Sequence, residues 1–165
     1  MTAPKTVLIL HNAVGHESAA DALDIQEQMD CVRTALTGHG DSAPTLAVDL
    51  GLDALKAHLR AHPPDAVFNL VEAIDDCGQL VPIVSGLLDH LQVPYTGCST
   101  EALLITGNKV LAKRWLRANG LATADWWDGA SPLPPHPGPG RWITKPVSED
   151  ASIGMDATAV VPDFS

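Results

Sequence analysis

Short apolar runs alternate with amphipathic patterns along the first hundred residues. Four runs rich in apolar and β-branched residues predict strands, at residues 5–10, 44–48, 65–71 and 92–96. The segments between them repeat apolar residues at spacings of three and four, which predicts helices. The first helix carries its apolar residues at Ala22, Ile25, Met29, Val32 and Leu36. The two later helices carry theirs at Leu52, Leu55 and Leu59 and at Val81, Val84, Leu87, Leu88 and Leu91.

This alternation predicts a parallel sheet covered by helices on both faces. The strands are continuous apolar runs, as in sheets buried on both sides, and each connection is long enough for a right-handed crossover. We therefore expect residues 1–104 to form an α/β domain with a doubly wound, Rossmann-like parallel sheet. Ligands of such sheets bind at the carboxyl ends of the strands, so the loops after residues 10, 71 and 96 would form one rim.

The pattern changes near residue 105, where basic residues and prolines become frequent. Residues 107–119 predict a basic helix that ends at Gly120. Five prolines between residues 131 and 140 exclude a helix there. Short strands are predicted at residues 122–127, 141–145 and 159–161. Residues 120–165 contain too few elements to close a core of their own.

Length and composition are those of a globular protein. The 165 residues fit one domain, or a small domain plus part of another, and a hydrophobic content of 45% argues against intrinsic disorder. The formal net charge of −10 argues against binding to nucleic acid or to an anionic membrane. No apolar run approaches the roughly 20 residues of a membrane span, and the N-terminus lacks the apolar region of a signal peptide, which indicates a cytoplasmic protein.

The charge is unevenly distributed along the chain. Residues 1–104 carry the whole net charge of −10, whereas residues 105–165 contain six basic and six acidic residues. The later part is therefore the better candidate for binding an anionic ligand. Three of its basic residues, Lys113, Arg114 and Arg117, are expected to form the solvated face of the predicted helix.

Two further lysines of this basic part lie at positions where a phosphate could bind. Lys109 opens the predicted helix, and Lys145 ends a predicted strand and precedes a loop of small and polar residues. An ammonium group beside such a loop can hold a phosphate, because the N–H and hydroxyl groups of the loop close over it. The simpler alternative is an exposed lysine beside a surface loop. The chain contains no glycine-rich phosphate loop ending in Gly-Lys-Ser or Gly-Lys-Thr.

Two stretches of the chain resemble the D-alanine–D-alanine ligase group of ATP-grasp enzymes. The first, residues 93–126, reads VPYTGCSTEALLITGNKVLAKRWLRANGLATADW. The second, residues 142–156, reads WITKPVSEDASIGMD, and the motifs occur in the order of the family. The sequence VFNLVE at residues 67–72 is similar to a divergent ligase-like subgroup.

This resemblance implies an ATP-dependent carboxylate–amine ligase that passes through an acyl phosphate and forms an amide or dipeptide bond. It implies a pre-ATP-grasp domain at residues 1–104, followed at residues 105–165 by the incomplete N-terminal portion of an ATP-grasp α+β domain. The implied cofactors are ATP and Mg²⁺. The implied substrates are a small carboxylate and an amine, of amino-acid or peptide-like kind. Family members commonly dimerise through the N-terminal domain, so a homodimer is an expectation here.

The resemblance also assigns residues to the binding sites of the family. The residues that match its ATP-phosphate contacts and the loop over the phosphates are Lys109, Lys145, Ser148, Glu149, Ser152 and Gly154. Glu17 matches a glutamate on the side of the first substrate. The catalytic residues and magnesium ligands of the family lie beyond these motifs, so neither a catalytic residue nor a metal ligand is expected in this chain.

Two positions and one loop depart from the family pattern. Gly15 stands where the first loop of the family has an acidic residue, and Ala151 replaces the first serine of a pair in the phosphate loop. Residues 71–78 replace the family's loop after the third strand. Changes on the side of the first substrate leave open whether D-alanine is a substrate.

Three hypotheses account for this sequence. The first is the N-terminal fragment of a ligase, inactive by itself. The second is a non-catalytic α/β module that binds a small molecule or a partner, and the third is one half of a split ligase. The first hypothesis predicts weak or absent ATP binding by residues 1–165 alone, because the adenine-binding residues would lie downstream.

Overall fold

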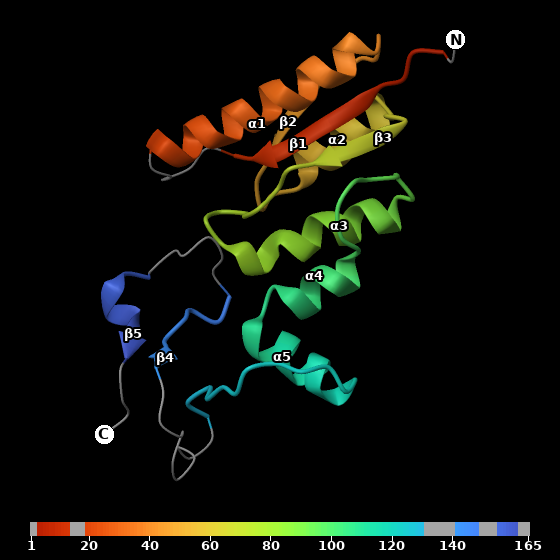
Figure 1. The fold of residues 1–165 in the computed structure, drawn as a ribbon. Helices are drawn as coiled ribbons and strands as arrows, with labels where there is room; N and C mark the ends of the chain where they lie inside the picture. The colour runs from red at the N-terminus through yellow and green to blue at the C-terminus, as the bar shows by residue number, and fades with distance from the viewer. Residues whose placement is uncertain (1–2, 14–18, 131–140, 149–154, 162–165) are drawn as a thin grey trace. The chain divides into compact units, whose positions relative to one another are not determined.

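The computed structural model describes residues 3–13, 19–130, 141–148 and 155–161 (Figure 1). The chain divides into two compact units, Met1–Leu103 and Leu104–Ser165. Each unit is described by itself. None of the described helices has the length and hydrophobicity needed to cross a membrane.

The first unit is built on a parallel sheet with the strand order β2-β1-β3 (Figure 1). Its strands are β1 (Val7–Asn12), β2 (Thr45–Val48) and β3 (Ala66–Asn69). In the register of the sheet, Ile9 of the central strand lies opposite Thr45 on one side and Phe68 on the other. The expected parallel sheet is confirmed.

Helices cover both faces of this sheet. They are α1 (Ala19–Gly38), α2 (Asp53–Ala61) and α3 (Val81–His90), the last preceded by a 3₁₀ turn at Gly78–Leu80. On one face, Leu8, Leu10 and Val67 pack in a core with residues of α2 and α3, namely Leu55, Leu59, Val84 and Leu88. On the other face α1 lies along β1 (Figure 1), where Ile9 and Met29 are buried. The predicted α/β fold with two covered faces is therefore confirmed.

The predicted fourth strand, residues 92–96, is not a strand. It forms an isolated bridge in which Tyr95 pairs with Val67. The Val67 N–H donates to the Pro94 carbonyl at 2.8 Å, and the Thr96 N–H donates to the Val67 carbonyl at 3.0 Å. Pro94 has no N–H to extend the ladder, and Gln92 has a positive φ of 55°, which interrupts the extended backbone. The segment therefore follows the sheet edge over a very short distance.

A hydrogen-bond network ties this edge to the helix α4 (Thr100–Thr106), which the apolar pattern did not predict. The Tyr95 hydroxyl donates to one Asp89 carboxylate oxygen at 3.0 Å, and the Thr100 hydroxyl donates to the other at 2.5 Å. The oxygen of Thr100 also lies 3.0 Å from the hydroxyl oxygen of Ser85, which is buried in α3. The start of α4 is thus fixed by side chains of α3.

The second unit contains the basic helix and a small antiparallel pair. The helix α5 (Lys109–Ala118) confirms the expected helix, and Gly120 follows it with a positive φ of 74°. The strands β4 (Trp142–Ile143) and β5 (Val160–Val161) pair with Ile143 opposite Val160, and a 3₁₀ turn at Ala157–Ala159 precedes β5. The strand expected at residues 122–127 is absent from the described chain, so that prediction is wrong.

Tyr95 is the only tyrosine of the chain, so its ionisation can be measured directly. Burial raises its pKa above the ordinary 10.0, and the Asp89 carboxylate raises it further because it accepts the phenol proton. We expect tyrosinate absorbance in an alkaline titration to appear above pH 10, and Asp89→Asn to move the midpoint down. The folded pKa exceeds the unfolded one, so the stability that Tyr95 contributes below pH 10 is lost as pH rises through its folded pKa.

The matched control for this titration is Asp53→Asn, which removes a carboxylate that is exposed on α2. We expect it to leave the tyrosinate midpoint unchanged. An equal midpoint for the wild type and Asp89→Asn would show that Asp89 does not hold the Tyr95 proton.

Candidate phosphate-binding site

The second unit brings the backbones around the two predicted phosphate-binding lysines together. Lys109 is the first residue of α5, and Lys145 comes two residues after β4. The Lys109 N–H donates to the carbonyl oxygen of Val147 at 2.9 Å. The start of α5 is therefore joined to the segment that follows Lys145. The side chain of Lys145 is exposed, and that of Lys109 is partly buried.

Ser148 follows this junction and has an unusual environment for a hydroxyl group. Its side chain is 7% exposed, and within the described part of the chain its Oγ has no hydrogen-bond partner. A buried hydroxyl without a partner is costly, typically by about 1–3 kcal/mol, so such a group suits a site where a ligand or a neighbouring segment supplies the missing bond. The position of Ser148 beside a phosphate stays a prediction.

The remaining residues of the predicted site lie outside the described residues. These are Glu149, Ser152 and Gly154 of the expected phosphate loop, and Glu17 of the expected first-substrate side. Their assignment stays a prediction.

The three basic residues expected on a solvated face of α5 bind the segment that follows the helix. Arg114 and Arg117 are nevertheless exposed, as expected, with 62% and 54% of their side chains accessible, whereas Lys113 is partly buried. Lys113 Nζ donates to the Thr123 hydroxyl at 3.0 Å and to the Ala124 carbonyl at 2.8 Å. The salt bridges of the two arginines are Arg114 to Asp128 at 2.7 Å and Arg117 to Asp125 at 2.8 Å.

Trp126 lies at the centre of these contacts. Its ring centre is 4.3 Å from the guanidinium carbon of Arg117 and 5.7 Å from Nζ of Lys113. Both distances are those of cation–π contacts. These cations therefore organise residues 123–128, and the phosphate-binding prediction rests on Lys109 and Lys145.

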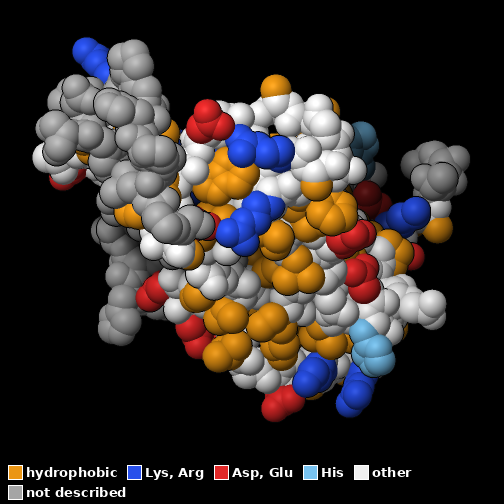
Figure 2. All heavy atoms as spheres, turned by 90° about the horizontal axis from the view of Figure 1, so that it is seen from below, with side chains coloured by type: hydrophobic (Ala, Val, Ile, Leu, Met, Phe, Trp, Pro, Cys, Tyr) orange, Lys and Arg blue, Asp and Glu red, His pale blue; other side chains and the backbone are white. Residues whose placement is uncertain are grey.

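The second unit also exposes apolar side chains. Leu111 and Trp115 lie one turn apart on α5 and are 43% and 51% exposed. Figure 2 shows one face of the whole molecule, on which hydrophobic side chains lie with Lys and Arg side chains among them. The other large apolar residues exposed in the described part of this unit are Leu104, Leu121, Trp127, Ile143, Val147 and Val160. A surface of this kind is typical of one that packs against another polypeptide segment.

Comparison with known proteins finds similarity to D-alanine–D-alanine ligases. No family model matches the chain. The D-alanine–D-alanine ligase of Ruegeria pomeroyi is 31% identical over 159 residues, which are 93% of this chain and 47% of that protein. The D-alanine–D-alanine ligase of Ruegeria sp. TM1040 is 30% identical over 173 residues, 99% of this chain and 52% of that protein. The chain resembles the D-alanine–D-alanine ligases.

Solved structures support the same fold. The D-alanine–D-alanine ligase of Bacillus anthracis aligns with a TM-score of 0.55 and 20% identity, over 76% of this chain and 38% of that one. The same enzyme complexed with ATP aligns with a TM-score of 0.57 and 19% identity, over equal shares. The chain thus spans about half the length of the curated ligases that it matches.

In the first unit, Asn12 organises the carboxyl rim of the sheet, where the resemblance to the ligases predicts the first substrate. Its side chain is 6% exposed at the end of β1. Its Oδ1 accepts hydrogen bonds from the N–H groups of Glu72 at 2.8 Å and Ala73 at 3.1 Å. The loop after β3 is therefore held at the end of β1. The loop then turns through Asp75 and Asp76, which both have positive φ.

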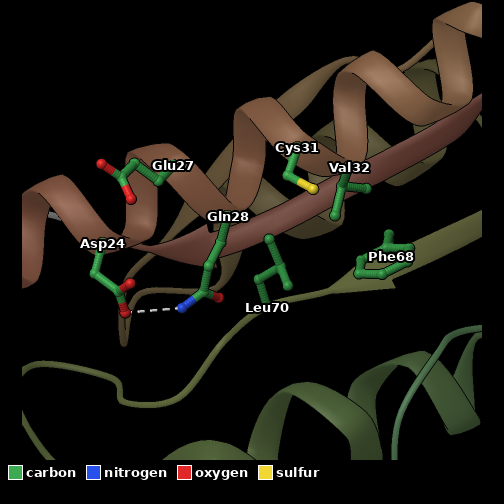
Figure 3. Close-up of a pocket in the computed structure, with 7 residues that line it drawn as sticks. All are labelled: Asp24, Glu27, Gln28, Cys31, Val32, Phe68 and Leu70. Atoms are coloured by element: carbon green, nitrogen blue, oxygen red, sulfur yellow. Dashed lines mark hydrogen bonds between the residues drawn. The ribbon is translucent and has the colours of Figure 1, made fainter.

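A shallow hollow of about 430 Å³ lies between α1 and β3 (Figure 3). Its apolar part is formed by Val32, Phe68 and Leu70, and its acidic part by Asp24 and Glu27. Gln28 and Cys31 complete the lining, and Gln28 donates a hydrogen bond to Asp24 at 2.9 Å. No residue that the sequence predicted for a binding site lines this hollow, and no motif marks it.

We expect Asn12→Ala to destabilise the first unit by about 1–3 kcal/mol, because two rim amides lose a partly buried acceptor. Urea denaturation followed by circular dichroism measures this change. The control Gln79→Ala removes an exposed amide side chain of the same unit and should change the unfolding free energy by less than about 0.5 kcal/mol. Equal effects of the two substitutions would exclude a structural role for the Asn12 side chain.

Proposed function

We propose that this chain supplies the N-terminal part of an ATP-dependent carboxylate–amine ligase, including side chains that bind the phosphates of ATP. The observation that carries the proposal is the junction of Lys109 with Val147, which joins the start of α5 to the segment after Lys145. Similarity to D-alanine–D-alanine ligases over 93% of the chain supports it. The neighbour complexed with ATP supports a nucleotide as the ligand.

In such a ligase a carboxylate attacks the γ-phosphate of ATP, and ADP leaves. An amine then attacks the acyl phosphate and releases inorganic phosphate as the amide bond forms. The two ammonium groups would reduce the negative charge that develops on the transferring phosphate. Ser148 would complete the contacts to the phosphate chain, because its buried hydroxyl has no partner within the described part of the chain.

The binding of Mg²⁺ and of adenine would depend on residues of the rest of the ligase. Among the described residues no group of three or more His, Cys, Asp or Glu side chains could hold a metal ion. We propose that Mg²⁺ and adenine are bound by the part of the ligase that corresponds to the other half of the relatives. The exposed apolar residues of the second unit, such as Leu111 and Trp115, would pack against that part.

We also propose a domain organisation, a substrate class, a cellular location and an assembly. Residues 1–104 would be the pre-ATP-grasp domain and residues 105–165 the start of the ATP-grasp domain. The substrates would be small amino-acid or peptide-like molecules, as in the named activity of the relatives. The ligase would act in the cytoplasm, where ATP is available, with a homodimer as the expected assembly and no nucleic-acid partner.

Tripolyphosphate binding tests the phosphate site in the 165-residue chain itself. We expect Lys145→Ala to raise the Kd for tripolyphosphate by about tenfold, because a charge-assisted contact is lost. Isothermal titration calorimetry measures the Kd, and Lys56→Ala, which removes an exposed lysine of the first unit, should leave it unchanged. ATP should bind no more tightly than tripolyphosphate, and micromolar ATP binding by residues 1–165 alone would contradict the assignment of adenine recognition to the other half.

Phosphate release tests the reaction in a protein that joins this chain to the remaining half of a ligase. We expect ATP-dependent phosphate release that requires an amino-acid substrate, and a loss of about 10²-fold or more with Lys145→Ala, because stabilisation of the transferring phosphate is removed. Lys56→Ala again serves as the control. Full activity of Lys145→Ala would exclude Lys145 from the phosphate site.

A further inference from the structure

Asn108 occupies the start of α5 and satisfies its first amides. Its Oδ1 accepts hydrogen bonds from the N–H groups of Val110 at 3.1 Å and Leu111 at 2.9 Å, and its carbonyl accepts from Ala112 at 2.8 Å. Its backbone is extended, with φ −127° and ψ 110°. These features are those of an N-cap residue, in which the side chain takes the place of the missing helical acceptors.

The one amide of the first turn that Asn108 does not bind is that of Lys109. This N–H donates to Val147, at the other side of the junction. All four amides at the start of α5 therefore have an acceptor within the protein. A phosphate at this end would be recognised by side chains and not by the helix amides. The placement of Lys109 relative to Lys145 then depends on the stability of the first turn of α5.

We propose that Asn108 is a positioning residue for the phosphate site, an inference that rests on the proposed function. By capping α5, Asn108 fixes the backbone of the first turn, and this backbone orients the Lys109 N–H toward the Val147 carbonyl. The bond to Val147 in turn fixes the segment that carries Lys145 and Ser148. Without the cap the first turn of α5 frays, the junction opens, and the two lysines no longer form one site.

The positioning role of residue 108 requires a side-chain hydrogen-bond acceptor, and it does not require the amide group of asparagine. A serine hydroxyl or an aspartate carboxylate at residue 108 can accept the same hydrogen bonds, and a carboxylate is also favoured by the helix dipole. Alanine offers no acceptor. The substitutions Asn108→Ser and Asn108→Asp should therefore preserve the junction that Asn108→Ala opens.

A matched control lies at the other end of the same helix. The Asn119 side chain donates to the carbonyl of Trp115 at 2.9 Å. Asn119→Ala removes a side-chain hydrogen bond from α5 without touching the junction. A purely structural contribution of Asn108 to helix stability would make the two alanine variants alike.

The first measurement is hydrogen exchange of the Lys109 amide in the 165-residue chain, observed by NMR. We expect Asn108→Ala to accelerate this exchange about tenfold or more, although Asn108 makes no side-chain bond to this amide in the structure. Asn108→Ser, Asn108→Asp and Asn119→Ala should exchange at close to the wild-type rate. Unchanged exchange in Asn108→Ala overturns the proposal, whether or not the chain binds phosphate.

The second measurement is the Kd for tripolyphosphate. Asn108→Ala should raise it by about fivefold, because the competent junction is less populated, and Asn108→Ser and Asn108→Asp should restore it. Faster Lys109 exchange with no change in Kd would overturn the positioning role. Absence of tripolyphosphate binding in the wild type would instead overturn phosphate binding by residues 1–165 alone, and the exchange data would still show whether Asn108 holds the junction.

Discussion

The burial of β1 on both faces is the constraint on which the first unit depends. Leu8, Ile9 and Leu10 are fully buried, and their alternation sends side chains to opposite faces of the sheet. A strand of this kind needs a neighbour on each side and a helical layer above and below. The sequence meets both needs with β2 and β3 as neighbours, α1 on one face, and α2 and α3 on the other. The strand then ends at Asn12, which orders the loop after β3.

The parts of the fold that follow from hydrophobic periodicity could be predicted from the sequence. The three strands and the helices α1, α2, α3 and α5 all have apolar residues at the expected spacing. The fourth strand could not be excluded in this way, because its failure depends on the missing N–H of Pro94 and on the left-handed backbone of Gln92. The helix α4 is short, and its position depends on Asp89 and Ser85, which are distant in sequence from its own residues.

The candidate site also has parts that the sequence predicts and parts that it does not. Lys109 and Lys145 could be selected from their chemistry and from the family motifs. Their junction is a backbone hydrogen bond to Val147, and side-chain identities do not reveal such a bond. Charge patterning predicts the solvated side chains of Arg114 and Arg117, but it does not show which acceptors lie near them. Asp125, Trp126 and Asp128, in the following ten residues, provide those partners. Aromatic and acidic residues just after a basic helix are a signal that could have revealed them.

The contacts at Asp128 and at β4 have a consequence for protein engineering. Asp128 is held by Arg114, and the chain is held again at Trp142 by pairing with Val161. These two contacts share no residue, so each can be removed by itself. A substitution at Arg114 would release Asp128 and leave the pairing of Trp142 with Val161 in place.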